Sequence, residues 1–135
     1  MATRNQLKDL ALLRRHEAQV LFDAQLYDGA RYLAGYVLEL ALKARICRIL
    51  DFQEYPDSGE FRRLYATHDL DLLLKLSGLS RKPSLQEKAL FDSWSTAALW
   101  KPERRYDVPG TAKREDVRDI LAAVEEVLRW IKRHW

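Results

Sequence analysis

Glu39 and Lys43 are the charged residues whose spacing is most informative in this chain. They lie four residues apart within the apolar segment 32–45, where a helix would place them on one face and let them form an ion pair. Gly35 stands in the same segment, and a glycine inside a helix costs about 1 kcal/mol relative to alanine. We therefore expect another backbone to approach closely at Gly35. The charged pair either holds the fold together or belongs to a binding site.

A second group of residues suited to ligand binding lies between residues 94 and 118. It contains a basic run, which is usually a solvated face but could contact the phosphates of RNA or a nucleotide. The run consists of Arg104, Arg105, Lys113, Arg114 and Arg118. Trp94, Trp100 and Tyr106 could stack on bases, although packing in a core or a dimer interface is the commoner role of tryptophan. Trp130 and Trp135 lie off the main apolar stripe of the last segment, which predicts a surface that contacts a partner.

The histidines and the cysteine argue against a metal site. His16, His68 and His134 have no acidic or cysteine partners at the spacing of metal ligands. Cys47 is the single cysteine, which excludes an internal disulfide and a cysteine-rich metal site. We expect no metal and no cofactor. The net charge of +3 is compatible with RNA or another phosphate-bearing partner without identifying one.

Length and composition indicate a single globular domain over residues 1–135. Hydrophobic residues make up 47% of the chain, enough for a core, and charged residues make up 32%, enough for a well-solvated surface. No apolar run approaches the roughly 20 residues that span a membrane. The N-terminal segment carries charges throughout and lacks the apolar centre of a signal peptide. We therefore expect a cytoplasmic protein with no membrane association.

Glycine and proline residues divide the chain into blocks with helical spacing of apolar residues. The blocks cover residues 5–27, 28–50, 70–76, a fourth that opens at residue 84, and a last one in which apolar residues recur from 117 to 131. Long helices joined by short connections favour a bundle. The prediction is an all-α, up-and-down antiparallel helical bundle of four main helices plus one short helix.

Polar residues at the block boundaries predict how the helices begin. Asp28 is expected to cap the second helix, and Thr67 or Asp69 the short third one. Ser84 and Glu87 have the spacing of a capping box for the fourth. The second helix is apolar over more than one face, so we expect it to be central or to sit at an interface.

Three segments of this chain resemble the HEPN family of small helical bundles. Residues 32–44 look like its second helix, residues 67–70 (Thr-His-Asp-Leu) like the segment that opens its short helix, and Trp94, Trp100 and residues 105–107 (Arg-Tyr-Asp) like its element before the last helix. Their order and spacing match, and together they span most of the chain. The resemblance implies a bundle, often homodimeric, and a gene often adjacent to one for a nucleotidyltransferase in a toxin–antitoxin or related pair.

The resemblance also implies a chemistry to look for. Catalytic HEPN members are metal-independent ribonucleases with an Arg-x(4–6)-His motif by the last helix, in which His moves a proton and Arg stabilises charge on the phosphate. In this chain Arg62 and Arg63 precede His68 at that spacing, and Arg129 precedes His134. Chance alone supplies about one such match in an arginine-rich chain.

The location of these matches favours a variant without the nuclease motif. Arg63 and His68 fall before the short third helix, and His134 lies at the end of the chain beyond Trp130, which is not polar. In the expected region, Arg105, Tyr106 and Asp107 are followed by no histidine within reach.

Two hypotheses follow. The first is a non-catalytic, dimeric interaction module that acts with a nucleotidyltransferase or another defence-type partner. Glu39, Lys43, Arg105, Tyr106 and Asp107 would line a groove that binds the partner, a nucleotide or RNA.

The second hypothesis is a metal-independent ribonuclease toxin of a toxin–antitoxin pair. His68 with Arg63 is the candidate catalytic pair, and Arg62 could replace Arg63. Arg129 with His134 is the alternative pair.

Overall fold

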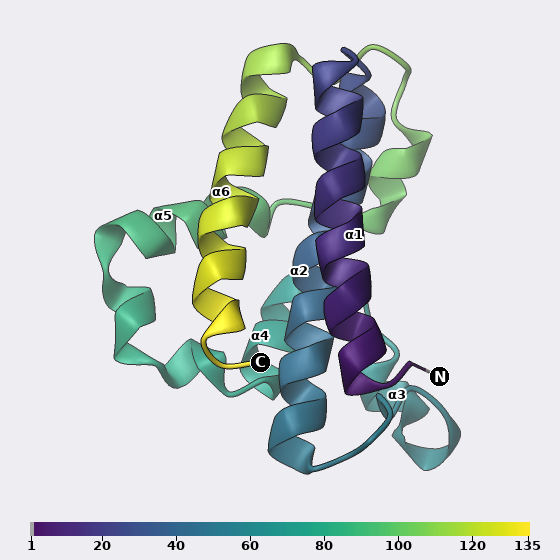
Figure 1. Ribbon diagram of the computed structural model, residues 1–135, viewed down its shortest axis with the longest axis vertical. Coiled ribbons are helices and arrows are strands. Elements are labelled where there is room, and N and C mark those ends of the chain that lie inside the picture. The colour runs from purple at the N-terminus through teal and green to yellow at the C-terminus, as the bar shows by residue number, and fades with distance from the viewer. Residues whose placement is uncertain (1) are drawn as a thin grey trace.

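The computed structural model describes residues 2–135, and over that range the chain forms six α-helices and no β-strand. Three long helices lie along the long axis of the molecule (Figure 1): α1 (Arg4–Asp23), α2 (Tyr27–Leu50) and α6 (Arg114–Lys132). The shorter helices are α3 (Arg62–Tyr65), α4 (Leu70–Leu76) and α5 (Lys88–Ala97). The prediction of an all-α fold is confirmed.

The three long helices run in two opposite directions. α1 runs antiparallel to α2, whereas α2 and α6 run in the same direction (Figure 1). The C-terminal ends of α2 and α6 meet, since Arg45 Nη1 donates to the carbonyl oxygen of His134 at 2.9 Å. The reason is the connection over residues 51–113, which holds three short helices and returns the chain to the end where α2 began.

The expectation that α2 is central is confirmed. It packs against both α1 and α6, and its buried side chains point to more than one face: Ala30, Ala34, Val37, Leu38, Ala41, Leu42, Ala44, Ile46 and Cys47. Many of these are alanines, and small side chains let neighbouring helices approach closely. A helix that is apolar on several faces belongs in the interior.

The expected caps are confirmed at one helix and wrong at two. The carboxylate of Asp69 accepts from Leu72 N and caps α4, which has the expected bounds. Asp28 lies inside the first turn of α2, and Leu26 holds the cap position without a side-chain bond. Ser84 belongs to a 3-10 helix (Pro83–Gln86), and α5 begins only after Glu87. The side chains of Asp28 and Ser84 instead accept hydrogen bonds from residues distant in sequence.

The prediction that Trp130 is exposed is wrong. Its side chain is buried, and its Nε1 donates to the hydroxyl of Ser84 at 2.8 Å. Residues 83–97 cover this face of α6, which the apolar stripe of the last helix alone could not indicate. Trp135 is partly buried against the core. Trp94 and Trp100 are core residues, as is usual for tryptophan.

Two further observations complete the fold. α1 ends four residues earlier than expected because Gln25 takes a left-handed conformation with φ of 63°. None of the helices in residues 2–135 combines the length and apolar character needed to cross a membrane.

Candidate functional site

The ion pair expected between Glu39 and Lys43 is present on α2. Nζ of Lys43 lies 3.2 Å from Oε2 of Glu39, and the side chain of Glu39 is only 5% exposed. Glu39 is one of two buried polar residues among those that the structure describes. The Lys43 ammonium also lies 5.0 Å from the centre of the buried Tyr55 ring. A buried carboxylate needs partners of this kind, because an unpaired charge is costly in the interior.

His68 is the second partner of the Glu39 carboxylate. Its Nδ1 lies 2.7 Å from Oε1 of Glu39, across the space between α2 and the loop that opens α4. Since a carboxylate only accepts, the imidazole donates from Nδ1 and leaves Nε2 available to a ligand. The side chain of His68 is 57% exposed, so this nitrogen is accessible from solvent.

Aromatic rings continue the site along α2. Tyr36 lies edge-on to both Trp100, at 4.8 Å between ring centres, and His68, at 6.3 Å. The hydroxyl of Tyr36 lies 3.3 Å from that of Tyr32. Burial, followed by the bond to Tyr32, raises the pKa of Tyr36 to about 12. Tyr36 therefore stays neutral at physiological pH, and its ring packs against the rings of Trp100 and His68.

Gly35 is required by a ring rather than by a backbone, which corrects the sequence-based expectation. A Cβ atom at this position would lie 1.9 Å from Cδ2 of Trp100. The indole ring thus lies directly on the surface of α2, and its Nε1 donates to the carbonyl oxygen of Tyr32 at 3.0 Å. This contact fixes where the chain leaves α5 and begins the segment that carries Arg105.

Residues 105–107 lie at the end of a 3-10 helix (Pro102–Tyr106) beside the N-terminal half of α2. The Arg105 guanidinium lies 4.8 Å from the centre of the exposed Tyr106 ring. Hydrogen bonds to the phenol oxygens of Tyr106 and Tyr32 raise the pKa of Arg105. The carboxylate of Asp107 accepts from Arg31 at 3.0 Å, so it is directed toward α2.

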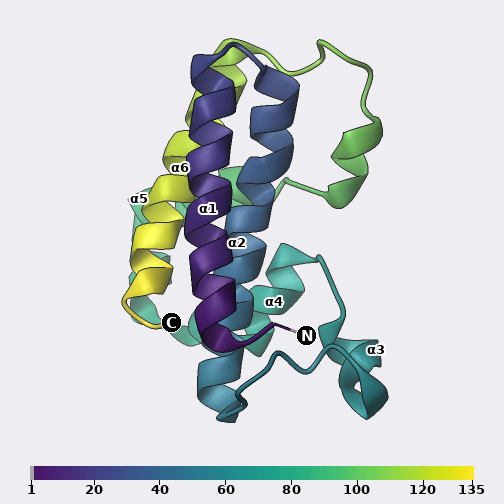
Figure 2. The same cartoon turned by 45° about the vertical axis from the view of Figure 1, so that its right-hand side comes forward.

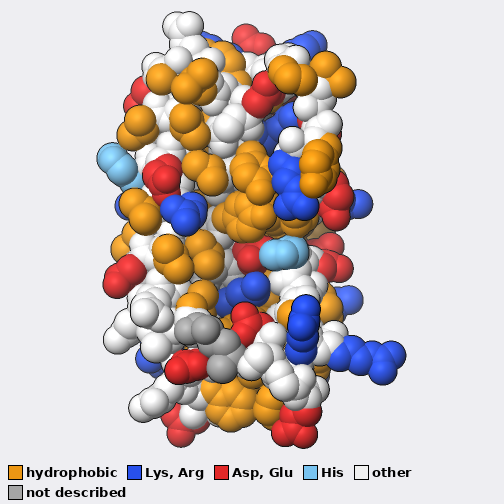
Figure 3. Space-filling view, turned by 90° about the vertical axis from the view of Figure 1, so that its right-hand side faces the viewer, with side chains coloured by type: hydrophobic (Ala, Val, Ile, Leu, Met, Phe, Trp, Pro, Cys, Tyr) orange, Lys and Arg blue, Asp and Glu red, His pale blue; other side chains and the backbone are white. Residues whose placement is uncertain are grey.

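One cavity of about 640 Å³ lies between the loop that carries His68 and the segment that carries Arg105. Residues 66–71 line one side of it, and Trp100, Lys101 and Arg105 line the other. Figure 3 shows a histidine in the middle of this face of the molecule. Hydrophobic and basic side chains lie above it, and acidic and basic side chains lie below it. His68 and Arg105, which are 37 positions apart in sequence, thus open onto the same space.

A profile of the HEPN domain matches residues 5–134 of the chain. The chain belongs to the HEPN family. Comparison with curated proteins and with solved structures gives no significant match. HEPN domains are commonly paired with nucleotidyltransferases or act as ribonucleases, so the site must be compared with both roles.

Arg63 and His68 do not line the same cavity in this structure. Arg63 lies on the short helix α3, is exposed, and is not among the residues that line the cavity of His68. Arg105 does line it. Of the residues in the Arg-x(4–6)-His match, His68 lines this cavity and Arg63 does not.

In the alternative pair, Arg129 and His134, the histidine contacts α2. The carbonyl oxygen of His134 accepts from Arg45 and Arg48 at 2.9 and 3.1 Å. Burial and the nearby cation of Lys82 lower the pKa of His134. The hydrogen bonds from Arg45 and Arg48 to His134 tie the end of α6 to α2. Arg129 is exposed.

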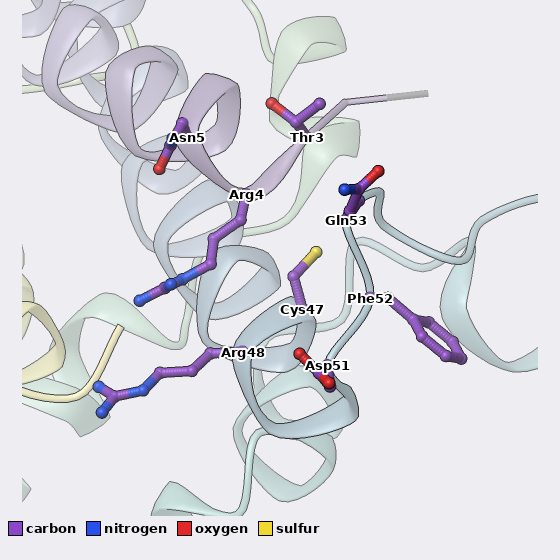
Figure 4. Close-up of a pocket in the computed structure, with 8 residues that line it drawn as sticks. All are labelled: Thr3, Arg4, Asn5, Cys47, Arg48, Asp51, Phe52 and Gln53. Atoms are coloured by element: carbon purple, nitrogen blue, oxygen red, sulfur yellow. The ribbon is translucent and has the colours of Figure 1, made fainter.

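A second cavity, of about 570 Å³, lies between the start of α1 and the end of α2. Figure 4 shows Arg4 and Arg48 pointing to the same side, toward the last residues of the chain. Both donate to the carbonyl oxygen of Trp135, at 2.6 and 3.4 Å. The cations of this cavity are thus engaged in holding the two ends of the chain together.

The acidic and histidine side chains of residues 2–135 are spread over the fold. The structure brings together no group of three or more His, Cys, Asp or Glu side chains that could hold an ion there. Asp69 and Asp71 line the first cavity, but one caps α4 and the other accepts from Nε1 of Trp94 at 3.2 Å.

Sequence reasoning missed the residues that attach the Arg105 segment to α2. Asp28 was interpreted as a cap, and Arg31 was not singled out. The signal that could have found them is periodicity, because residues 28, 31, 35, 39 and 43 fall on one face of a helix.

Proposed function

We propose that this HEPN domain is a non-catalytic interaction module of the cytoplasm, which works as a homodimer with a nucleotidyltransferase or another defence-type partner. We further propose that it binds a nucleotide or single-stranded RNA in the cavity between His68 and Arg105. The observation that carries the proposal is that these two side chains line one cavity, with Trp100 as its wall.

The chemistry of the cavity suits a phosphate-bearing ligand. Arg105 offers a planar fork of donors to phosphate oxygens. Tyr106 is 77% exposed beside it, and an exposed aromatic ring next to a guanidinium suits base stacking. Three carboxylates also line the cavity: those of Asp69 and Asp71 accept hydrogen bonds of the fold, and Glu103 is exposed, while Lys101 and Arg105 are the cations that line it with them.

Arg105→Ala tests this proposal against Arg63→Ala, which removes an exposed arginine outside the cavity. The probes are a fluorescein-labelled single-stranded RNA and AMP, followed by anisotropy and by competition at fixed salt. Loss of one charged contact should weaken binding by about tenfold in Arg105→Ala. Equal affinity of Arg105→Ala and the wild type would refute the proposed site.

The partner is tested separately by co-expression. We expect a minimal nucleotidyltransferase encoded beside this gene to co-purify with the domain, and light scattering to give the mass of two copies for the domain alone. A monomeric domain that leaves the nucleotidyltransferase in the flow-through would contradict this part of the proposal.

The second candidate function is the metal-independent ribonuclease, and one observation favours it. Glu39 orients His68 through Nδ1, as a carboxylate orients the histidine of an acid–base site. Arg105 rather than Arg63 would then stabilise charge on the phosphate. Cleavage of structured RNA in EDTA that His68→Ala abolishes would establish this function in place of the first.

A further inference from the structure

One face of α2 contacts both halves of the candidate site. The residues of this face recur every three or four positions along the helix: Asp28, Arg31, Tyr32, Gly35, Tyr36, Glu39 and Lys43. Figure 2 shows the segment after α5, drawn in green, beside the N-terminal half of α2, and α4 beside its C-terminal half. Asp28 and Glu39 are 11 residues apart, which is roughly 16 Å along a helix.

Asp28 binds the backbone of the connection to α6. Its Oδ2 accepts from the amide of Gly110 at 2.6 Å, and its Oδ1 accepts from the amide of Ala112 at 3.0 Å. Ala112 is itself buried against Ala30 and Val117. The two amide bonds lower the pKa of Asp28, so its carboxylate is ionised and accepts at both oxygens at neutral pH.

Arg31 adds the next contact, one turn along the helix. Its Nη2 lies 3.0 Å from Oδ2 of Asp107, and its side chain is only 12% exposed. The same carboxylate oxygen receives Arg104 at 3.5 Å. A guanidinium that is largely buried holds its partner in a narrower range of positions than a solvated one.

The attachments lie on both sides of Arg105 and Tyr106. Trp100 is held before them by the carbonyl oxygen of Tyr32 and the surface of Gly35. Asp107, Gly110 and Ala112 are held after them. Glu39, farther along the same helix, holds His68 on the opposite side of the cavity. The distance between Arg105 and His68 is therefore set by a single rigid element.

We propose that Asp28 and Arg31 are positioning residues for the Arg105 side of the cavity, a role that rests on the proposed binding of RNA or nucleotide there. Neither side chain lines the cavity. They act by holding residues 107–112 against α2, so that Arg105 meets the phosphate while His68 contacts the same ligand.

Asp28→Asn tests the role with little change in shape, because the amide retains one acceptor and replaces the other with a donor. Asp92→Asn is the matched control, since Asp92 is an exposed helical residue paired only with Lys88. Hydrogen exchange of the Gly110 and Ala112 amides should accelerate by about tenfold in Asp28→Asn and stay unchanged in Asp92→Asn.

Binding of fluorescein-labelled single-stranded RNA provides the second readout. Asp28→Asn and Arg31→Gln should each weaken affinity by about threefold to tenfold. In a background that already carries Arg105→Ala, neither should have a further effect, because the group they position is gone. A role confined to stability would lower the melting temperature and give the same loss of affinity in both backgrounds.

The outcomes separate this role from the proposed function. Faster exchange with unchanged RNA affinity would overturn the positioning role, and unchanged exchange would overturn the attachment itself. A wild-type domain that binds neither RNA nor AMP would overturn the proposed function and the positioning role with it, and the exchange rates would still decide whether Asp28 holds the segment.

Discussion

Nδ1 of His68 lies 2.7 Å from Oε1 of Glu39, while the other oxygen of the same carboxylate receives Lys43. One buried acid thus joins a loop to a helix and leaves the far edge of the imidazole exposed. The contact is the reason that His68, although outside the expected motif region, keeps its place in the second function that we propose.

The tautomer of His68 follows from this contact. Because the Glu39 carboxylate accepts a hydrogen bond from Nδ1, we expect the neutral imidazole to carry its proton on Nδ1. Imidazole nitrogen shifts in NMR spectra will measure this, and Glu39→Gln should reduce the preference. A wild-type ring with its proton on Nε2 would show that the carboxylate does not orient His68.

Removing Lys43 should destabilise the fold more than removing the whole pair. Lys43→Met leaves a buried carboxylate with one partner, and we expect the free energy of unfolding to fall by about 3 kcal/mol. The double variant with Glu39→Leu should recover part of this loss, because no buried charge remains.

Urea unfolding of the two variants provides the measurement. Lys75→Met is the control, since it removes an exposed lysine of α4 and should change stability by less than about 0.5 kcal/mol. A double variant less stable than Lys43→Met would mean that the ion pair stabilises the bundle directly.

Gly35→Ala should displace the indole ring of Trp100. The added methyl group would lie about one bond length too close to the ring, and overpacking of this kind typically costs about 1–3 kcal/mol. Thermal unfolding and tryptophan fluorescence will report the change. Gly29→Ala is a matched control on the same helix, because its nearest neighbour is a Leu21 methyl group at 3.3 Å, which would have to shift by only a few tenths of an ångström. Equal stability of the two variants would contradict the close packing of Trp100.

His134 should make the domain less stable in mild acid. Its pKa is lowered in the folded state by burial and by Lys82, so the unfolded chain binds the proton more readily. The free energy of unfolding should therefore fall as the pH drops through the ordinary histidine range near 6.5. His134→Gln should lose less stability between about pH 7.5 and pH 5 than the wild type. Parallel stability curves for the two proteins would exclude this contribution.

Local signals predicted part of the fold well. The short helix Leu70–Leu76 was predicted with correct bounds, and Asp69 is one of the two caps proposed for it, because the cap and the apolar spacing lie within a few residues of each other. Asp28 and Ser84 had equally good local signals but bind residues far along the chain, at Gly110 and Trp130. A cap is predicted from its neighbours, and a distant partner of the same side chain leaves no local trace.

In the candidate site, too, contacts between residues close in sequence were predictable and contacts between distant residues were not. The Glu39–Lys43 pair follows from helical spacing alone, whereas the bond from His68 spans 29 positions and depends on how α4 packs on α2. Arg63 looked suitable because it is near His68 in sequence. Arg105 is the arginine at the cavity because Trp100 packs on Gly35 and brings its segment back to α2.

The bond from Arg4 to the carbonyl oxygen of Trp135 brings the first turn of α1 next to the residues that follow α6, in the lower part of the molecule in Figure 1. A short linker between them would make a circular chain without moving any helix. Such a chain could be opened at the exposed residues 108–110. Arg105 would then be carried on a free end, next to a bundle whose connectivity is otherwise intact.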